Sequence, residues 1–223
     1  MNKRTVIGVP PSYNKDESLE LSSTAKYMKY LYQKGADTVM TTAGTSHFNL
    51  LSVSEIHALN NTVIEEFKKN KIIGIPALST LQAVDFIKEY SHVNDDVSFM
   101  ILYPERFYNY KQIIDYCHKI RDNTKSPIYV HGKTIRIASG GSWDYDHQII
   151  NEMFDSQIIK GIKEEHSNLQ RSYNFVSNLH NEIDVIVAGG SMRRFEFLES
   201  AGANSFLSGI GNFYPEIEQE YLD

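Results

Sequence analysis

Residues 158–165 form the stretch Ile158-Ile159-Lys160-Gly161-Ile162-Lys163-Glu164-Glu165, a β-branched run that ends in an amine. This pattern predicts a short buried strand over 158–163 with Lys163 at its carboxyl end. Burial disfavours the ammonium form of lysine, so an amine here can attack a ketone near neutral pH, which an exposed lysine does poorly. The competing interpretation is a surface lysine with a solvated head group. Lys163 is the first candidate catalytic residue.

Seven other apolar or β-branched runs resemble this one, and amphipathic stretches separate them. The eight runs cover residues 5–9, 38–42, 72–76, 97–103, 127–131, 158–163, 184–188 and 205–208. Their first residues are 21 to 34 positions apart, a spacing typical of a repeated strand–helix unit. Eight such units predict an α/β protein with the (β/α)8 TIM barrel fold. An open flavodoxin-like sheet needs fewer strands.

Two of the segments between the strands carry clear helix signals. In the first, apolar residues recur on one face from Leu21 to Leu31, and Gly35 then supplies a stop. In the second, Ser52 and Glu55 have the spacing of a capping box that opens a helix. The residues expected on the buried face of the second helix are Ile56, Leu59, Val63 and Phe67.

Composition is that of an ordinary globular protein, with 41% hydrophobic and 22% charged residues. The 223 residues suit a single barrel domain over 1–223, and no Pro-, Ser- or Gly-rich linker divides them. A net charge of −6 argues against nucleic acid as a partner, because that binding rests on neutralising phosphates. The densest basic stretch, Lys68-Lys69-Asn70-Lys71, is typical of a helix C-terminus.

The chain is expected to be cytoplasmic and to have no membrane partner. A single cysteine, Cys117, rules out an internal disulfide and suits a reducing compartment. No apolar run approaches the roughly 18 residues of a membrane span. The first residues lead directly into a strand and not into the apolar region of a signal peptide.

In a TIM barrel the chemistry lies at the carboxyl ends of the strands. That rule selects the polar residues and glycines at or just beyond each predicted strand end. These are Thr45, His47, His131, Lys163, Gly189 and Gly209. We expect them to lie around one mouth of the barrel.

The order of these motifs resembles that of the dihydrodipicolinate synthase / N-acetylneuraminate lyase family, the pyruvate-dependent class I aldolases, over nearly the whole chain. Gly161-Ile162-Lys163-Glu164 matches the segment that holds the family's Schiff-base lysine. Residues 43–48, followed by Leu51-Ser52, fall where the family has the loop that holds the pyruvate carboxylate. The resemblance therefore implies a substrate-binding role for Gly44, Thr45 and His47.

Further matches accompany this resemblance, and so do departures from the family pattern. Arg136 falls on the arginine that contacts the second substrate in synthase members, and Gly189 on the glycine that leaves room for the keto acid. The family's proton-relaying tyrosine is His131 here, and a hydroxyl residue of the carboxylate loop is Gly44. Imidazole can both give and accept protons at pH 7, so we expect His131 to act as the relay.

The resemblance implies a Schiff-base-forming lyase that cleaves or condenses a pyruvate unit with an aldehyde acceptor, with no cofactor and no metal. Three alternatives stay open. The first is a family member that has lost turnover and acts as a keto-acid-binding or regulatory protein. The second is a metal site at His47, His131 and Glu165. The third is a phosphate site at the glycines of residues 188–191 and 208–212.

Two expectations concern the surface. Residues 139–145, which include Trp143 and Tyr145, are expected to form a lid or rim that can stack on a substrate. Only residues 215–223 follow the last strand, too few for a full outer helix, and relatives usually continue with further helices. We therefore expect a homo-oligomer, a dimer or tetramer, that buries the apolar seam. The seam residues are Phe213, Tyr214, Ile217 and Tyr221.

Overall fold

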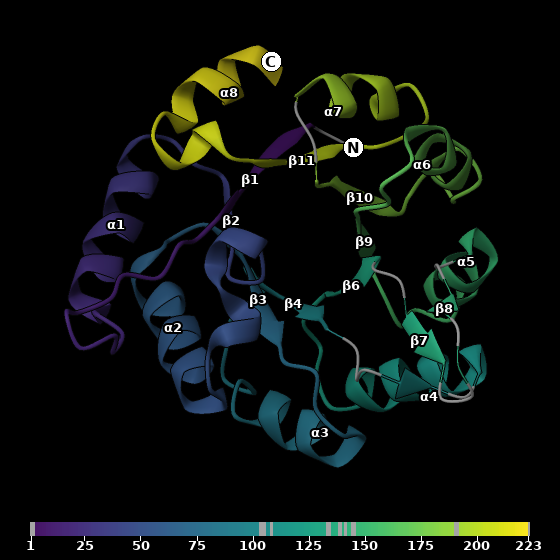
Figure 1. Cartoon of the computed structure of the whole chain (residues 1–223), viewed down its shortest axis with the longest axis horizontal. Coiled ribbons are helices and arrows are strands. Elements are labelled where there is room, and N and C mark those ends of the chain that lie inside the picture. Colours follow the sequence, from purple (N-terminus) through teal and green to yellow (C-terminus); the bar gives the residue numbers. More distant parts are fainter. Residues whose placement is uncertain are drawn as a thin grey trace.

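The computed structural model is a closed barrel of eight parallel strands within the described residues (Figure 1). The structure describes residues 3–102, 106–107, 109–132, 135–137, 140, 142–143, 146–189 and 192–222, with only the backbone at 106, 135–137 and 142–143. The barrel strands are β1 (Arg4–Gly8), β2 (Thr38–Met40), β3 (Asn70–Ile75), β4 (Val97–Ile101), β6 (Ile128–Gly132), β9 (Gly161–Glu164), β10 (Asp184–Val187) and β11 (Ser205–Ser208). Because β1 pairs with both β2 and β11, the sheet has no free edge. The predicted TIM barrel is confirmed.

Helices surround the barrel as an outer ring (Figure 1). In the described part of the chain they are α1 (Leu21–Gln33), α2 (Val53–Glu66), α3 (Thr80–Lys88), α4 (Tyr110–Arg121), α5 (His147–Asp155), α6 (Leu169–Val176), α7 (Met192–Glu199) and α8 (Pro215–Leu222). Both predicted helix signals are confirmed. α1 ends just before Gly35, which has a φ of +89°, and Ser52 and Glu55 form the capping box of α2. No helix among the described residues is long and apolar enough to span a bilayer.

A small second sheet accompanies the barrel. Its strands are β5 (Arg106–Phe107), β7 (Ile135–Ile137) and β8 (Ser142–Trp143), with β7 pairing β5 in parallel and β8 antiparallel. Figure 1 shows β7 and β8 outside the ring of barrel strands, near α4 and α5. The predicted lid thus contains one strand of a β-hairpin. Tyr145 and the side chain of Trp143 lie outside the described residues.

The basic stretch at residues 68–71 departs from its predicted place. α2 already ends at Glu66, and Asn70 and Lys71 belong to β3. Lys71 is buried and forms an ion pair with Asp96. The prediction of a helix C-terminus was wrong because strand pairing with β2 and β4 continues to the first residues of β3.

The C-terminal segment forms more structure than predicted. α8 has eight residues, as many as α6 and α7, and it packs against β1. It completes the outer ring between α7 and α1 (Figure 1). The expectation of an uncovered seam was therefore wrong. The four named seam residues are nevertheless exposed, with more than half of each side chain accessible.

Inward-facing side chains fill the barrel in layers, as strand alternation requires. The middle layer is apolar and consists of Val6, Met40, Ile72, Met100, Tyr129 and Ile186, with Leu207 packed against it. Below it, at the amino ends of the strands, a polar floor closes the barrel. The layer above it is the mouth, where Lys163 lies.

The floor is built on Arg4 and Asp184, which form an ion pair. Tyr129 Oη donates to Asp184 Oδ2 at 2.6 Å, and Arg4 Nε donates to Ser205 Oγ at 3.1 Å. Burial alone would lower the pKa of Arg4, but the Asp184 carboxylate and Tyr129 raise it above its usual value. Gly161 makes this packing possible, because a Cβ there would lie 2.2 Å from the Asp184 carbonyl and 2.8 Å from the Tyr129 ring.

We predict that Gly161→Ala lowers the free energy of unfolding by about 1–3 kcal/mol or more, since the added carbon overlaps backbone that cannot move freely. Gly209→Ala is the matched control, because a Cβ at Gly209 meets nothing within 4 Å. Urea unfolding followed by circular dichroism measures both. Equal stability of the two variants would show that the floor tolerates a side chain at Gly161.

Candidate active site

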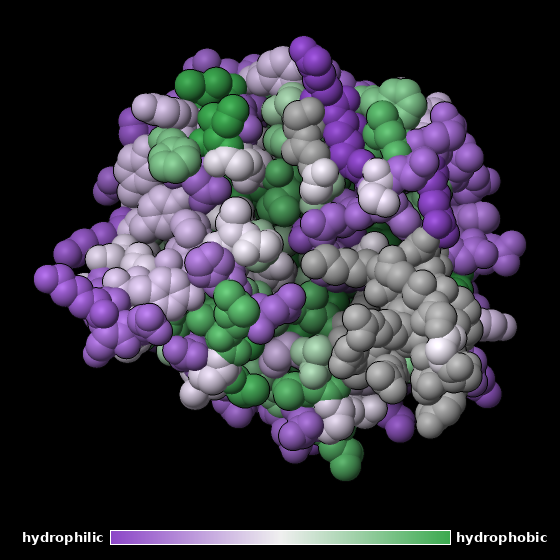
Figure 2. All heavy atoms as spheres, in the orientation of Figure 1, coloured by the Kyte–Doolittle hydropathy of each residue, from purple (hydrophilic) through white to green (hydrophobic). Residues whose placement is uncertain are grey.

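Lys163 projects into the barrel from β9. Its neighbours Ile162 and Glu164 face outward, and Ile162 belongs to the core between the barrel and the helices. The Lys163 residue is 1% exposed, and its place near the carboxyl end of β9 puts its amine at the mouth of the barrel, above the apolar layer. The surface-lysine interpretation is therefore wrong for this residue. Figure 2 shows the mouth face, with hydrophobic residues at the bottom of a central hollow and hydrophilic residues over much of the rim.

His131 lies directly beside Lys163 because β6 and β9 pair in parallel with these two residues in register. Lys163 Nζ is 3.2 Å from His131 Nε2 and 3.2 Å from Glu165 Oε2. His131 Nε2 is itself 2.6 Å from Glu165 Oε2. We call Lys163, His131 and Glu165 the mouth trio. Sequence reasoning considered Glu165 only as a metal ligand, although its place two residues after Lys163 already put it on the same face of the strand.

The mouth trio holds an amine, an imidazole and a carboxylate within hydrogen-bond distance of one another. Burial disfavours charge on the Lys163 amine, whereas the neighbouring Glu165 carboxylate favours the ammonium form. His131 Nε2 can accept a proton from the amine or donate one to the carboxylate. The arrangement can therefore move a proton to or from Nζ without bulk water.

Gly189 packs directly against Glu165. It follows β10 with a φ of +68°, and a Cβ there would lie 3.0 Å from Glu165 Cγ. A side chain at this position would be strained by the backbone conformation and would also press on the carboxylate. The absence of a side chain at Gly189 therefore leaves room for the Glu165 side chain.

The loop after β2 lies at the β2 and β3 side of the barrel (Figure 1). It contains two 3₁₀ turns, Gly44–Ser46 and Phe48–Leu50, joined by His47 in the left-handed conformation. A Cβ on Gly8 would lie 2.7 Å from Thr45 Oγ1, so the loop rests on the bare end of β1. Gly44 and Thr45 are exposed at this mouth.

Thr42 is a mouth residue that sequence reasoning missed. It is buried two residues after the end of β2, on the same inward face as Met40, and no described residue bonds its Oγ1. A Cβ on Gly74 would lie 2.3 Å from both Thr42 Cγ2 and Phe48 Cε2, so these side chains share the space above β3. A buried hydroxyl without a protein partner is a candidate ligand contact. The period-two alternation from Met40 is the signal that could have found it.

The two remaining predicted residues lie elsewhere or are incompletely described. His47 is exposed, and its ring stacks on Tyr13, with Nδ1 3.3 Å from the Tyr13 hydroxyl. Arg136 lies in β7, and its side chain is outside the described residues. Among the described residues, no three His, Cys, Asp or Glu side chains form a metal-binding cluster, so the metal alternative gains no support.

The phosphate alternative is disfavoured where the structure describes its loops. The Gly211 amide donates to Ser208 Oγ at 2.7 Å and to Glu218 Oε2 at 3.2 Å. A buried carboxylate therefore occupies the place that a phosphate would need. Burial raises the pKa of Glu218, and the Gly211 amide opposes that shift. Residues 190 and 191 lie outside the described part of the chain.

Glu164 anchors the end of β9 from the outer side of the barrel. It is buried and accepts hydrogen bonds from His166 Nδ1 at 2.8 Å, Ser172 Oγ at 2.8 Å and Arg194 Nη2 at 2.9 Å. Burial would raise the pKa of Glu164, but the bonds from His166 and Arg194 outweigh it and lower the pKa. This network fixes the backbone that carries Lys163.

Solved structures with the same fold include three with informative ligands or sources. Dihydrodipicolinate synthase from Oceanobacillus iheyensis is 19% identical, with 99% of this chain and 72% of that one covered and a TM-score of 0.78. YagE, an Escherichia coli K12 prophage protein of the dihydrodipicolinic acid synthase family solved with pyruvate, is 17% identical, with 99% and 74% covered and a TM-score of 0.83.

A third structure is a variant of Sulfolobus solfataricus 2-keto-3-deoxygluconate aldolase, solved with L-2-keto,3-deoxy-galactonate. It is 16% identical, the match covers 98% of this chain and 71% of the aldolase, and the TM-score is 0.78. No curated protein matches the sequence. The sequence profile of the Dihydrodipicolinate synthetase family matches residues 2–223. That match spans nearly the whole chain and agrees with the barrel and its order of motifs, and the chain belongs to the Dihydrodipicolinate synthetase family.

Proposed function

We propose that the protein is a class I aldolase that forms an imine between Lys163 and the keto carbon of a pyruvate unit. The observation that carries this proposal is the buried Lys163 amine, held 3.2 Å from both His131 and Glu165 at the mouth of the barrel. An amine needs a proton acceptor to become a nucleophile and a proton donor to expel water from the carbinolamine. The mouth trio supplies both.

The proposed steps assign each proton. Lys163 loses a proton to His131 or Glu165, and Nζ then attacks the keto carbon. The nitrogen then passes one proton to the former keto oxygen, which takes up a second proton from the protonated base and leaves as water, so that the protonated imine remains. Cleavage of the bond to the aldehyde carbon removes the proton of the substrate hydroxyl, and the resulting enamine takes a proton at its methyl-forming carbon. His131 is the group we assign to these transfers, with Glu165 orienting its imidazole.

The carboxylate of the keto acid requires hydrogen-bond donors at the same mouth. Thr42 Oγ1 is buried without a partner among the described residues, and Thr45 lies on the loop above it. We propose these two hydroxyls as carboxylate contacts, together with backbone amides of residues 44–47. Gly189 and Arg136 keep their proposed roles at the keto acid and the second substrate.

The ligands of two relatives support a 2-keto acid as substrate. One structure holds pyruvate and another L-2-keto,3-deoxy-galactonate. Because His131 stands where the family has its relay tyrosine, we favour a lyase for a sugar acid or another specialised keto acid over a synthase of lysine precursors. A protein that binds keto acids without turnover is the alternative that the next two experiments separate.

We also propose a reducing, cytoplasmic setting and a homo-oligomer. The single cysteine, Cys117, is buried in α4, and burial raises the pKa of its thiol, so it is a core residue. Phe213, Tyr214, Ile217 and Tyr221 expose apolar surface along α8 and the turn before it. Exposed apolar surface of this kind generally marks an interface, which we assign to a second copy of the chain.

Borohydride reduction in the presence of pyruvate is expected to attach a stable adduct to Lys163, because reduction converts the imine into a secondary amine. Peptide mass spectrometry locates the adduct. Lys160, three residues earlier on an exposed site, is the internal control and should stay unmodified. No adduct at saturating pyruvate, or an adduct on a different lysine, would overturn the imine proposal.

His131→Phe is expected to slow turnover of a cleavable 2-keto acid by about 10²- to 10⁴-fold, the usual contribution of one acid–base group. Imine trapping on Lys163 should persist at long incubation, since the amine remains. His118→Phe, at an exposed position on α4, serves as the control. Unchanged turnover in His131→Phe would mean that this histidine has a packing role and takes no part in proton transfer.

Ile217→Asp is expected to shift the protein towards the monomer at micromolar concentration, because it puts a charge into the proposed interface. Light scattering measures the mass. Leu81→Asp, an exposed leucine on α3, is the control and should leave the mass unchanged. A wild-type protein that is already a monodisperse monomer would contradict the proposed interface.

A further inference from the structure

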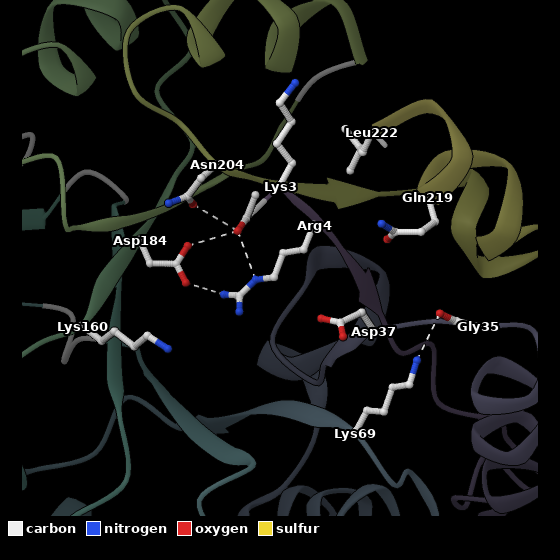
Figure 3. Close-up of a pocket in the computed structure, with 11 residues that line it drawn as sticks. Lys3, Arg4, Gly35, Asp37, Lys69, Lys160, Asp184, Asn204, Gln219 and Leu222 are labelled. Carbon is white, nitrogen blue, oxygen red and sulfur yellow. Dashed lines mark hydrogen bonds and ion pairs between the residues drawn. The ribbon is translucent and has the colours of Figure 1, made fainter. Parts of the chain in front are cut away.

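A second cavity opens at the opposite end of the barrel from Lys163. It has a volume of about 950 Å³ and lies at the amino ends of the strands, where Arg4, Asp184 and Ser205 of the polar floor form part of its lining (Figure 3). Its charged lining comes from elements far apart in sequence. These residues are Lys3, Arg4, Asp37, Lys69, Lys160 and Asp184. We call it the floor cavity.

The floor cavity concentrates positive charge in an acidic protein. Its charged lining consists of four cations and two carboxylates, whereas the whole chain carries a net charge of −6. Asp184 is already paired with Arg4, and Asp37 accepts a hydrogen bond from Thr38 Oγ1 at 2.8 Å. At the rim, Lys3 pairs with Glu199 at 2.6 Å. With the Arg4–Asp184 and Lys3–Glu199 pairs set aside, the two lysines Lys69 and Lys160 face one carboxylate, Asp37, so the remaining lining keeps an excess of positive charge.

Arg4 is held rigidly with one nitrogen left for a ligand. Its Nε bonds Ser205, and its Nη2 bonds Tyr129 at 3.1 Å and pairs with Asp184. No residue of the described chain accepts a hydrogen bond from Nη1. A guanidinium that is already fixed loses little conformational freedom when it binds an anion.

The two lysines lie on either side of Arg4 with unmet donors. Lys160 Nζ has no hydrogen-bond or ion-pair partner within the described residues, and Figure 3 shows it reaching from the start of β9 towards the space below Arg4. Lys69 reaches in from the other side, and among the described residues its amine bonds only the Gly35 carbonyl, at 3.5 Å. Three cationic groups therefore face one space from three different strands or loops.

We propose that the floor cavity binds a small organic anion with several negative charges, such as a phosphate ester or a polycarboxylate. Arg and Lys donors match the oxygens of both groups. The volume far exceeds that of a single inorganic ion and falls in the usual range for small-molecule sites. The polar, charged lining disfavours an apolar ligand. This site does not depend on the proposed aldolase chemistry, because it uses none of the residues of the mouth trio.

The test is isothermal titration calorimetry of the full chain with pyrophosphate and, separately, with citrate, at constant ionic strength maintained with chloride. Wild type and Lys163→Ala are expected to bind one of these probes with equal affinity in the micromolar to millimolar range. The Lys69→Gln/Lys160→Gln double variant is expected to bind at least about tenfold more weakly, since two charge-assisted contacts to the anion are lost. Binding of one probe and not the other distinguishes the phosphate from the carboxylate class.

The matched control is Lys111→Gln/Lys119→Gln, two exposed lysines on α4 that carry the same change in net charge. It should bind as wild type does, and circular dichroism should show all variants folded. Three results would each overturn the proposal. They are no binding of either probe at about 10 mM, equal loss in the α4 control, and loss of binding in Lys163→Ala, which would place the anion at the mouth.

Discussion

The parallel pairing of β6 with β9 places His131 beside Lys163, and the chemistry proposed for this protein depends on that register. A shift of one residue in either strand would turn one of the two side chains outward, towards the helices. In the observed register, Nζ and Nε2 are 3.2 Å apart, and Glu165 closes the group from the next inward position of the same chain segment. The mouth trio is thus a consequence of strand alternation and one pairing.

The rest of the barrel stabilises that arrangement from three directions. Below the trio, a layer of apolar side chains separates the amine from the polar floor. Behind it, Glu164 ties the end of β9 to His166, Ser172 and Arg194 on the outer side. Beside it, Gly189 has no side chain and so leaves room for the Glu165 side chain. Glycine is also required lower in the strand, where Gly161 admits the Tyr129 ring and the Asp184 backbone.

Much of the fold and the centre of the site could be predicted from the sequence, because strand–helix repetition and the position of a residue at a strand end are local patterns. The barrel, the capping box of α2 and the stop at Gly35 are examples. Contacts between distant residues could not be predicted in this way. The Arg4–Asp184 pair, the carboxylate of Glu218 on the Gly211 amide and the buried position of the Thr42 hydroxyl depend on which strands become neighbours. The prediction that the segment after the last strand is too short to cover it was also wrong, since the eight residues of α8 are enough.

The chemistry that we propose requires the Lys163 amine, activated by His131 and Glu165, to become covalently bonded to a keto acid. A crystal structure of the protein soaked with pyruvate tests it most directly. We expect continuous electron density from Lys163 Nζ to the C2 carbon of pyruvate, with the carboxylate near Thr42 and Thr45. Pyruvate bound at the mouth without a bond to Lys163, or a mouth that stays unoccupied at saturating pyruvate, would contradict it.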